Sequence, residues 1–259
     1  EEQLGQPLFA RVGRGLRLTE AGQLALGYAD SIFASGSELV ALLREGRREH
    51  RQVLRIGAVA TLSRNFQENF LRPLLERADV ELVLQAGSLA ELLARLRVHT
   101  LDLVLSNRRV QASAEDPWRC RRLARQPVSL VGRARLKRKA FRFPDELAEV
   151  PLLLPGRDND IRTGFDQMCE TLGIRYRLRA EVDDMALLRL LARDTDSVAL
   201  LPTVVVQDEL RSGTLVEYGV VPDLHESFYA TTVQRHFEPP LLKALLRRTE
   251  AEVLSASLG

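Results

Sequence analysis

The 259-residue sequence contains few metal-binding side chains, and these are widely separated. Its two cysteines, Cys120 and Cys169, lie far apart and outside any CxxC spacing. This excludes a disulfide framework and a zinc cluster, and it favours a reducing compartment. The four histidines show neither HxxxH nor HExxH spacing. We therefore expect neither a metal site nor a cofactor.

Signals for catalysis, export and membrane insertion are also missing. The sequence has no GxGxxG, GxxxxGK[ST] or GxSxG motif. It has no run of about 18 apolar residues that could cross a membrane, and residues 1–5 lack the basic and apolar regions of a secretion signal. We expect a cytoplasmic protein that is neither an enzyme nor a membrane protein.

The formal net charge of +2 conceals clusters of basic residues. Residues 8–18 predict a short hairpin, because Gly13 and Gly15 supply a tight turn between two apolar flanks. Three arginines, Arg11, Arg14 and Arg17, lie on or beside that turn. Guanidinium groups on a protruding hairpin can reach DNA phosphates or the minor groove. The alternatives are a solvated basic loop and, for Arg17, a role in the alternation of the hairpin.

A long helix is predicted after the hairpin, with Thr19 as its N-cap and Glu20 in its first turn. Apolar residues recur at steps of three and four along it, at positions 24, 28, 32, 39 and 42. This stripe needs a partner, and a second copy of the same helix is the simplest one.

From residue 53 onward the pattern alternates between strand and helix, which predicts an α/β fold with helices on the faces of parallel sheets. About 200 residues of this pattern fit two small lobes better than one continuous core. Strands are predicted at 54–58, 80–85, 101–105, 128–131, 152–154, 178–182, 198–201 and 228–233, and helices at 64–76, 89–98, 161–172, 185–193, 203–211 and 240–254.

The N-terminal segments EQLGQPLFAR (residues 2–11) and GRGLRLTEAG (residues 13–22) closely resemble the LysR-type transcriptional regulators. In that family a winged helix-turn-helix ends in such a pattern, and Gln3 stands where Glu is usual. Later segments fit the family's effector domain in order: HTLDLVL (99–105), SVALLP (197–202) and DELRSGTL (208–215). The segments YAD (28–30), LLPGR (153–157) and DDMAL (183–187) are similar to the branch that contains a sodium-responsive activator of a sodium/proton antiporter.

This resemblance implies four parts. Residues 1–18 would be the end of a recognition helix and the wing, so that the chain begins inside its DNA-binding domain; residues 19–50 would be a dimerising linker helix. Residues 53–131 plus 229–259 would form lobe I, and residues 132–228 lobe II, of an effector domain similar to type 2 periplasmic binding proteins. The implied partners are double-stranded operator DNA, a small-molecule or ion effector, a homodimer or homotetramer, and RNA polymerase.

The effector site follows from topology, because ligands of open α/β sheets bind beyond the carboxyl ends of the strands. Hydroxyl, amide and guanidinium groups at these ends could hold a small polar molecule, including an anion. The candidates are Thr61, Ser63, Ser106, Asn107, Ser129, Arg157 and Asn159.

Some of these positions have competing interpretations. Ser63 can instead be a helix cap, and for Asp158 and Asp160 we favour turn and cap roles. A cation site built on such oxygens has no supporting ligand spacing.

Two lobes alone would also fit a periplasmic solute-binding protein. Residues 1–50 decide against that class, because a transport receptor has no use for a wing and a dimerising stripe. The favoured hypothesis is a regulator that senses an effector between its two lobes and controls transcription as a dimer or tetramer.

Overall fold

The computed structural model describes residues 5–13, 15–45, 52–113, 116–134, 141–233 and 240–254. Near the N-terminus, β1 (Phe9–Val12) and β2 (Gly15–Leu18) form an antiparallel hairpin. Gly13 lies in the turn of this hairpin and has a φ of 63°. This is a left-handed backbone conformation, which favours glycine. The predicted hairpin is thus confirmed. Arg14 and residues 1–4, where the end of a recognition helix was expected, lie outside the described residues.

Helix α1 (Glu20–Glu45) follows the hairpin directly. Thr19 caps it as predicted: its Oγ1 accepts a hydrogen bond from the Gly22 N–H at 3.0 Å and donates one to the Pro7 carbonyl at 2.7 Å. A Cβ on Gly22 would lie 1.9 Å from the Leu8 carbonyl oxygen. Glycine at this position therefore lets the helix pack closely against the hairpin.

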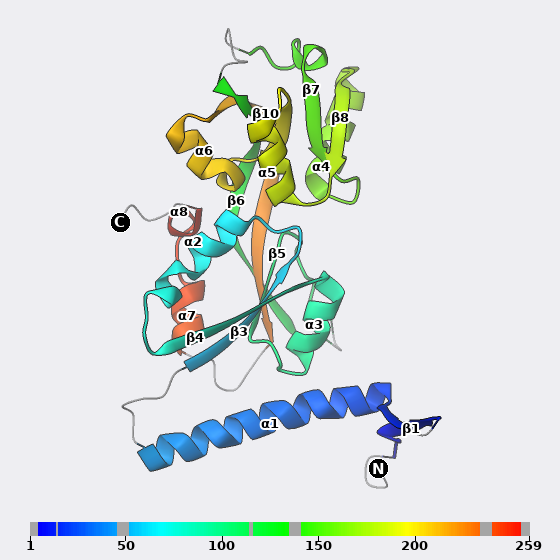
Figure 1. Ribbon diagram of the computed structural model, residues 1–259, viewed down its shortest axis with the longest axis vertical. Helices are drawn as coiled ribbons and strands as arrows, with labels where there is room; N and C mark the ends of the chain where they lie inside the picture. Colours follow the sequence, from blue (N-terminus) through cyan, green and yellow to red (C-terminus); the bar gives the residue numbers. More distant parts are fainter. Residues whose placement is uncertain are drawn as a thin grey trace.

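Helix α1 lies across the end of the effector domain, next to α3 (Figure 1). Gly27 packs against Val98, and the rings of Tyr28 and His99 meet edge-on with centroids 6.1 Å apart. Two other apolar side chains of α1 face outward: Ile32 is 68% exposed and Phe33 is 74% exposed. No described helix is both long and apolar enough to span a bilayer.

The effector domain is built on one eight-stranded mixed sheet with the strand order β4-β3-β5-β10-β6-β9-β7-β8. Two long antiparallel strands, β6 and β10, pair along their length and cross between the lobes (Figure 1). Parallel strands flank them on either side: β3, β4 and β5 in lobe I, and β7, β8 and β9 in lobe II. The bounds are β3 Gln52–Val59, β4 Val80–Gly87, β5 Leu103–Ser106, β6 Trp118–Arg133, β7 Pro151–Pro155, β8 Arg177–Val182, β9 Val198–Pro202 and β10 Leu215–Val233.

Helices cover the sheet in both lobes. Lobe I has α2 (Arg64–Leu75), α3 (Leu89–Arg97), α7 (Pro240–Leu246) and α8 (Glu250–Leu254). Lobe II has the 3₁₀ turns η3 (Leu147–Glu149) and η4 (Thr203–Val206), and α4 (Asp160–Leu172), α5 (Met185–Asp194) and α6 (Gln207–Ser212). In lobe I, Phe66 of α2 stacks on Phe228 of β10 with ring centroids 4.0 Å apart, so the core reaches the crossing strands.

The predicted α/β class and two-lobed architecture are confirmed, but some predicted elements have different bounds. Strands β6 and β10 are 16 and 19 residues long, whereas only their ends at 128–131 and 228–233 were predicted. The missed half of β6 carries exposed arginines, including Arg119 and Arg121; its pairing with β10 keeps this polar segment extended. The predicted helix 203–211 begins as η4, and the predicted helix 240–254 is divided into α7 and α8.

Candidate functional site between the two lobes

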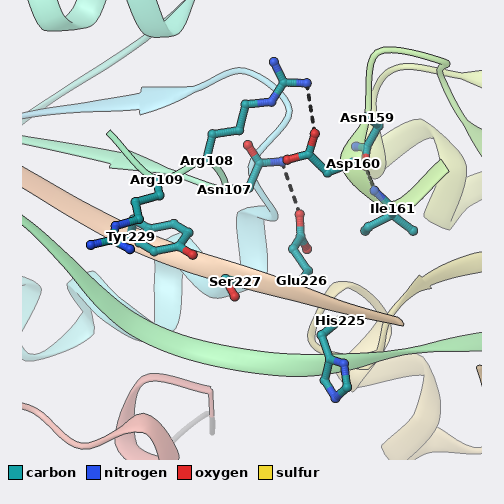
Figure 2. Close-up of a pocket in the computed structure, with 10 residues that line it drawn as sticks. All are labelled: Asn107, Arg108, Arg109, Asn159, Asp160, Ile161, His225, Glu226, Ser227 and Tyr229. Atoms are coloured by element: carbon teal, nitrogen blue, oxygen red, sulfur yellow. Dashed lines mark hydrogen bonds and ion pairs between the residues drawn. The ribbon is translucent and has the colours of Figure 1, made fainter. Parts of the chain in front are cut away.

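A cavity of about 280 Å³ lies where the two lobes meet. Residues 107–109 line it from the loop after β5, residues 159–161 from the start of α4, and residues 225–227 with Tyr229 from β10. Figure 2 shows these side chains around the crossing strand. The cavity therefore joins a lobe I loop, a lobe II helix and a strand that belongs to both.

The loop after β5 reaches across to lobe II. Ser106 is fully buried, and its Oγ donates to the Arg108 carbonyl at 2.7 Å, which holds the loop in shape. The Arg108 guanidinium donates to the Asp158 carbonyl and lies 3.3 Å from Asp160 Oδ1. Both partners of this ion pair are more than half exposed, so solvent screens it.

Helix α4 begins at the cavity wall. Asn159 is its N-cap, and its Oδ1 accepts a hydrogen bond from the Ile161 N–H at 2.9 Å. Arg162, 3% exposed, anchors the first turn to the strands beneath it: its Nη1 donates to the Pro155 carbonyl at 3.2 Å and to Glu181 Oε2 at 3.1 Å. The start of α4 is thus firmly positioned relative to β7 and β8.

Glu226 on β10 is the buried acid of the cavity, with 4% of its surface exposed. Asn107 Nδ2 donates to its Oε1 at 3.3 Å, as Figure 2 shows. Its Oε2 is buried and has no hydrogen-bond partner among the described residues. Burial raises the pKa of Glu226 to about 7; the negative charge of Asp160 acts in the same direction, and the Asn107 hydrogen bond opposes it. We call the contacts of Asn107, Arg108, Asp158, Asp160 and Glu226 the α4 seam.

A second set of contacts joins the lobes at α2. The Arg189 guanidinium donates to Asn65 Oδ1 at 3.0 Å and to Glu209 Oε1 at 2.7 Å, and it lies 3.5 Å from Asp208. Asn65 belongs to lobe I and also donates to the Val205 carbonyl at 3.2 Å. We call these five residues the α2 seam. Here the buried carboxylate, Glu209, is neutralised by an arginine.

Two of the predicted effector residues, Asn107 and Asn159, line the cavity. Ser106 precedes Asn107 in the chain, but its hydroxyl is used in the hydrogen bond to the Arg108 carbonyl within the loop. Ser63 caps α2 by accepting from the Phe66 N–H at 3.3 Å, which was its alternative role. Of these four positions, Asn107 and Asn159 line the cavity, one from each lobe.

The other predicted effector residues do not line this cavity. Ser129 is fully buried and donates to Glu217 on β10, whereas Thr61 is half-buried. Arg157, whose side chain is 80% exposed, lies 3.6 Å from Glu181. A role in effector binding remains a prediction for all seven positions.

Asp158 lies in the turn before α4, as favoured, but the cap is Asn159, and Asp160 lies in the first turn of α4 and pairs with Arg108. Sequence reasoning missed Glu226 and its neighbours on β10. The sequence did contain a pattern that indicates its burial. Glu226 alternates with Phe228 and Ala230 along the strand, so all three side chains face the same side, and all three are buried. A carboxyl group in the buried phase of a strand indicates a functional site.

At the other end of the chain, the wing arginines fall on different faces. In the β1–β2 register Arg11 pairs with Leu16, and Arg17 pairs with Ala10. Because side chains alternate along a strand, Arg11 and Arg17 project from opposite faces of the hairpin. Both are exposed, but a DNA surface on one face of the hairpin would contact only one of them directly.

Fold and cavity together define a two-lobed ligand-binding domain preceded by a hairpin and a long helix. The family described as LysR substrate binding domain matches residues 47–253. The chain therefore belongs to the LysR substrate-binding domain family.

Known relatives extend this match over the whole chain. The transcriptional activator protein NhaR of Escherichia coli (strain K12) is 25% identical over 259 residues, which is 100% of this chain and 85% of that protein. ArgP from Mycobacterium tuberculosis has a similar structure, with a TM-score of 0.67 and 17% identity, covering 97% of this chain and 83% of that one. Vibrio fischeri DarR, solved in complex with DNA, has a TM-score of 0.59 and 18% identity, covering 95% and 85%.

Proposed function

We propose that this protein is a LysR-type transcription regulator of the cytoplasm, which binds operator DNA as a homo-oligomer and senses an effector between its lobes. The observation that carries the proposal is the order of parts along the chain. A basic hairpin, a helix with outward apolar side chains and a LysR substrate-binding domain follow one another without interruption. The relative NhaR, a transcriptional activator, and DarR, a protein solved on DNA, each match this chain over 85% of their own length.

DNA contact is assigned to the hairpin arginines, Arg11, Arg14 and Arg17. On a wing they would bind phosphates or the minor groove and supply affinity rather than sequence choice. Arg11 and Arg17 are on opposite faces, so we expect their substitution by alanine to have unequal effects on affinity.

Dimerisation is assigned to α1. Leu24, Ile32 and Phe33 are each about half exposed or more, and apolar side chains grouped on one helix mark an interaction surface. A second α1 would remove them from water, each worth about 1.5–3 kcal/mol when fully buried. An Ile32→Glu, Phe33→Glu variant should sediment as a smaller species than the wild type in analytical ultracentrifugation. A Leu75→Glu variant, which changes an exposed residue at the end of α2, should keep the wild-type size.

Binding-site selection from genomic DNA tests the function directly. The full-length protein should enrich a specific duplex, and its affinity for that duplex should fall steeply with salt. Arg11→Ala or Arg17→Ala should reduce the slope of log affinity against log salt by about one, if that residue contacts a phosphate. Equal affinity for the selected duplex and for random DNA would refute the proposal. A monomer that binds a solute but no DNA would favour a solute-binding receptor.

A further inference from the structure

The cavity at the α4 seam carries an inference about the chemistry of its ligand, which rests on the proposed sensing function. Its buried acid, Glu226, lines the cavity, and the Oε2 atom of this residue has no hydrogen-bond donor among the described residues. A buried carboxylate oxygen that lacks a donor is costly, because it has lost its water without gaining a partner. A ligand that brings a donor to this atom removes that cost.

The charges around the cavity indicate what kind of donor fits. Among the described residues, the hydrogen-bond partner of Glu226 is the neutral amide of Asn107, which leaves the carboxylate charge unneutralised. Two guanidinium groups of the same loop also line the cavity. Arg108 is held by Asp160 and by the Asp158 carbonyl, and Arg109 lies beside Tyr229 (Figure 2). A positively charged donor from outside would supply both the missing hydrogen bond and the missing charge.

The size of the cavity limits the ligand. A volume of about 280 Å³ lies at the lower end of the range of small-molecule sites. The walls combine the apolar Ile161, which is 2% exposed, with the ring of Tyr229. These walls and this volume fit a ligand with a short apolar chain and one charged group.

We propose that this cavity binds a small organic amine, with its ammonium group on Glu226 Oε2 and its apolar part between Ile161 and Tyr229. Ile161 lies on α4 of lobe II, whereas Tyr229 lies in the part of β10 that pairs with β5 of lobe I. The bound amine therefore contacts both lobes. It thereby favours the arrangement of the lobes in which all three wall elements reach it.

The side-chain amide signals of Asn107 in ¹⁵N-labelled full chain provide the test, with Asn107→Ser to assign them. The probe is propylammonium chloride at pH 8, with sodium propionate and 1-propanol as anionic and neutral probes of similar size, at constant ionic strength. Propylammonium should shift the Asn107 signals saturably, and the other two probes should leave them unchanged. A saturable shift with propionate instead, or no shift with propylammonium, overturns the proposal.

Two variants place the ammonium group. Glu226→Gln removes the charge but keeps the shape, and it should weaken propylammonium binding at least tenfold. Glu209→Gln is the matched control, because Glu209 is also buried with one unpartnered oxygen but is neutralised by Arg189; it should bind propylammonium as the wild type does. Binding unaffected by Glu226→Gln overturns the proposal, even if the wild type responds to the probe. No DNA enters this experiment, so its failure leaves the regulator function to be decided by the binding-site selection.

Discussion

The α2 seam and the α4 seam join the same two lobes with different chemistry. At the α2 seam, Arg189 holds Asn65 of lobe I and neutralises the buried Glu209. At the α4 seam, the described residues give the buried Glu226 one hydrogen-bond donor, the amide of Asn107, and the nearby Arg108 forms a solvent-screened pair with Asp160. Among the described residues, each of these two carboxylates has one oxygen without a hydrogen-bond partner, and Glu226, unlike Glu209, has no ion pair there.

This difference separates a structural contact from a binding contact. A charge network completed within the chain stabilises one arrangement of the lobes and needs nothing from outside. A carboxylate that is left incomplete beside a cavity makes its arrangement depend on a ligand. We therefore interpret the α2 seam as the fixed side of the interlobe contact and the α4 seam as the responsive side.

Breaking the α2 seam should have the largest effect on stability. Arg189→Met leaves the Glu209 carboxylate buried without a cation and Asn65 Oδ1 without its donor. We expect the free energy of unfolding to fall by about 2–3 kcal/mol, less than the 3–5 kcal/mol of a fully buried pair, because Arg189 is partly exposed. Urea unfolding followed by circular dichroism measures this loss.

Arg193→Met is the matched control, because Arg193 lies on the same helix but forms its ion pair with the exposed neighbour Asp194, and Glu209 acts on it only as the weakest of its charge interactions. It should change the free energy of unfolding by less than about 0.5 kcal/mol. If the two substitutions were equally mild, the α2 seam would not be the fixed side.

Glu226 should make stability depend on pH. Its pKa is raised from 4.5 to about 7 in the folded chain, so the folded state holds a proton that the unfolded state has already released. The resulting stabilisation is fully present below pH 4.5 and is lost as the pH rises to about 7. Glu226→Gln should remove this dependence and raise the free energy of unfolding at pH 8 by about 1 kcal/mol, or the melting temperature by about 2–4 °C.

Thermal unfolding at intervals between pH 5 and pH 8 shows whether this dependence exists. Arg108, Arg109, Asp160 and His225 also line the cavity, so the diagnostic quantity is the difference between wild type and Glu226→Gln. Glu68→Gln, a substitution at an exposed carboxyl group, should retain the wild-type profile. An unchanged profile in Glu226→Gln would mean that solvent reaches this carboxyl group.

The smallest effect is expected at the edge of the α4 seam. Arg108→Ala removes an ion pair whose partners are 53% and 72% exposed. Such pairs contribute about 0–1 kcal/mol, so the urea midpoint should hardly move. A loss above about 2 kcal/mol would show that Arg108 fastens the lobes as Arg189 does, and the contrast between the seams would disappear.

Much of this fold could be predicted from the sequence because its periodicities are local. The alternation of apolar strands and amphipathic helices indicated the two lobes, and Thr19 and Ser63 indicated the starts of α1 and α2. The outer half of β6 could not be found in this way, since Arg119 and Arg121 interrupt the apolar pattern and only the pairing with β10 keeps the segment extended.

Two residues of the candidate site could also be predicted from the local pattern of strands along the sequence. Asn107 and Asn159 follow the carboxyl ends of β5 and β7, where topology places ligands. Glu226 follows no strand end. It becomes buried only when β5 and β6 flank β10 and the start of α4 lies over it, and these are contacts between segments more than 60 residues apart in the sequence.

Titration of the Glu226 carboxyl group itself tests the contrast between the two seams most directly. Carboxyl carbon signals of ¹³Cδ-glutamate-labelled protein, with the Glu226 signal identified by its absence from Glu226→Gln, give the midpoint without reference to stability. We predict a midpoint of about 7, as expected for a buried carboxyl group that lacks a neutralising charge. A midpoint near 4.5 would show a solvated or charge-paired carboxyl group and would contradict the account of the α4 seam as the responsive side.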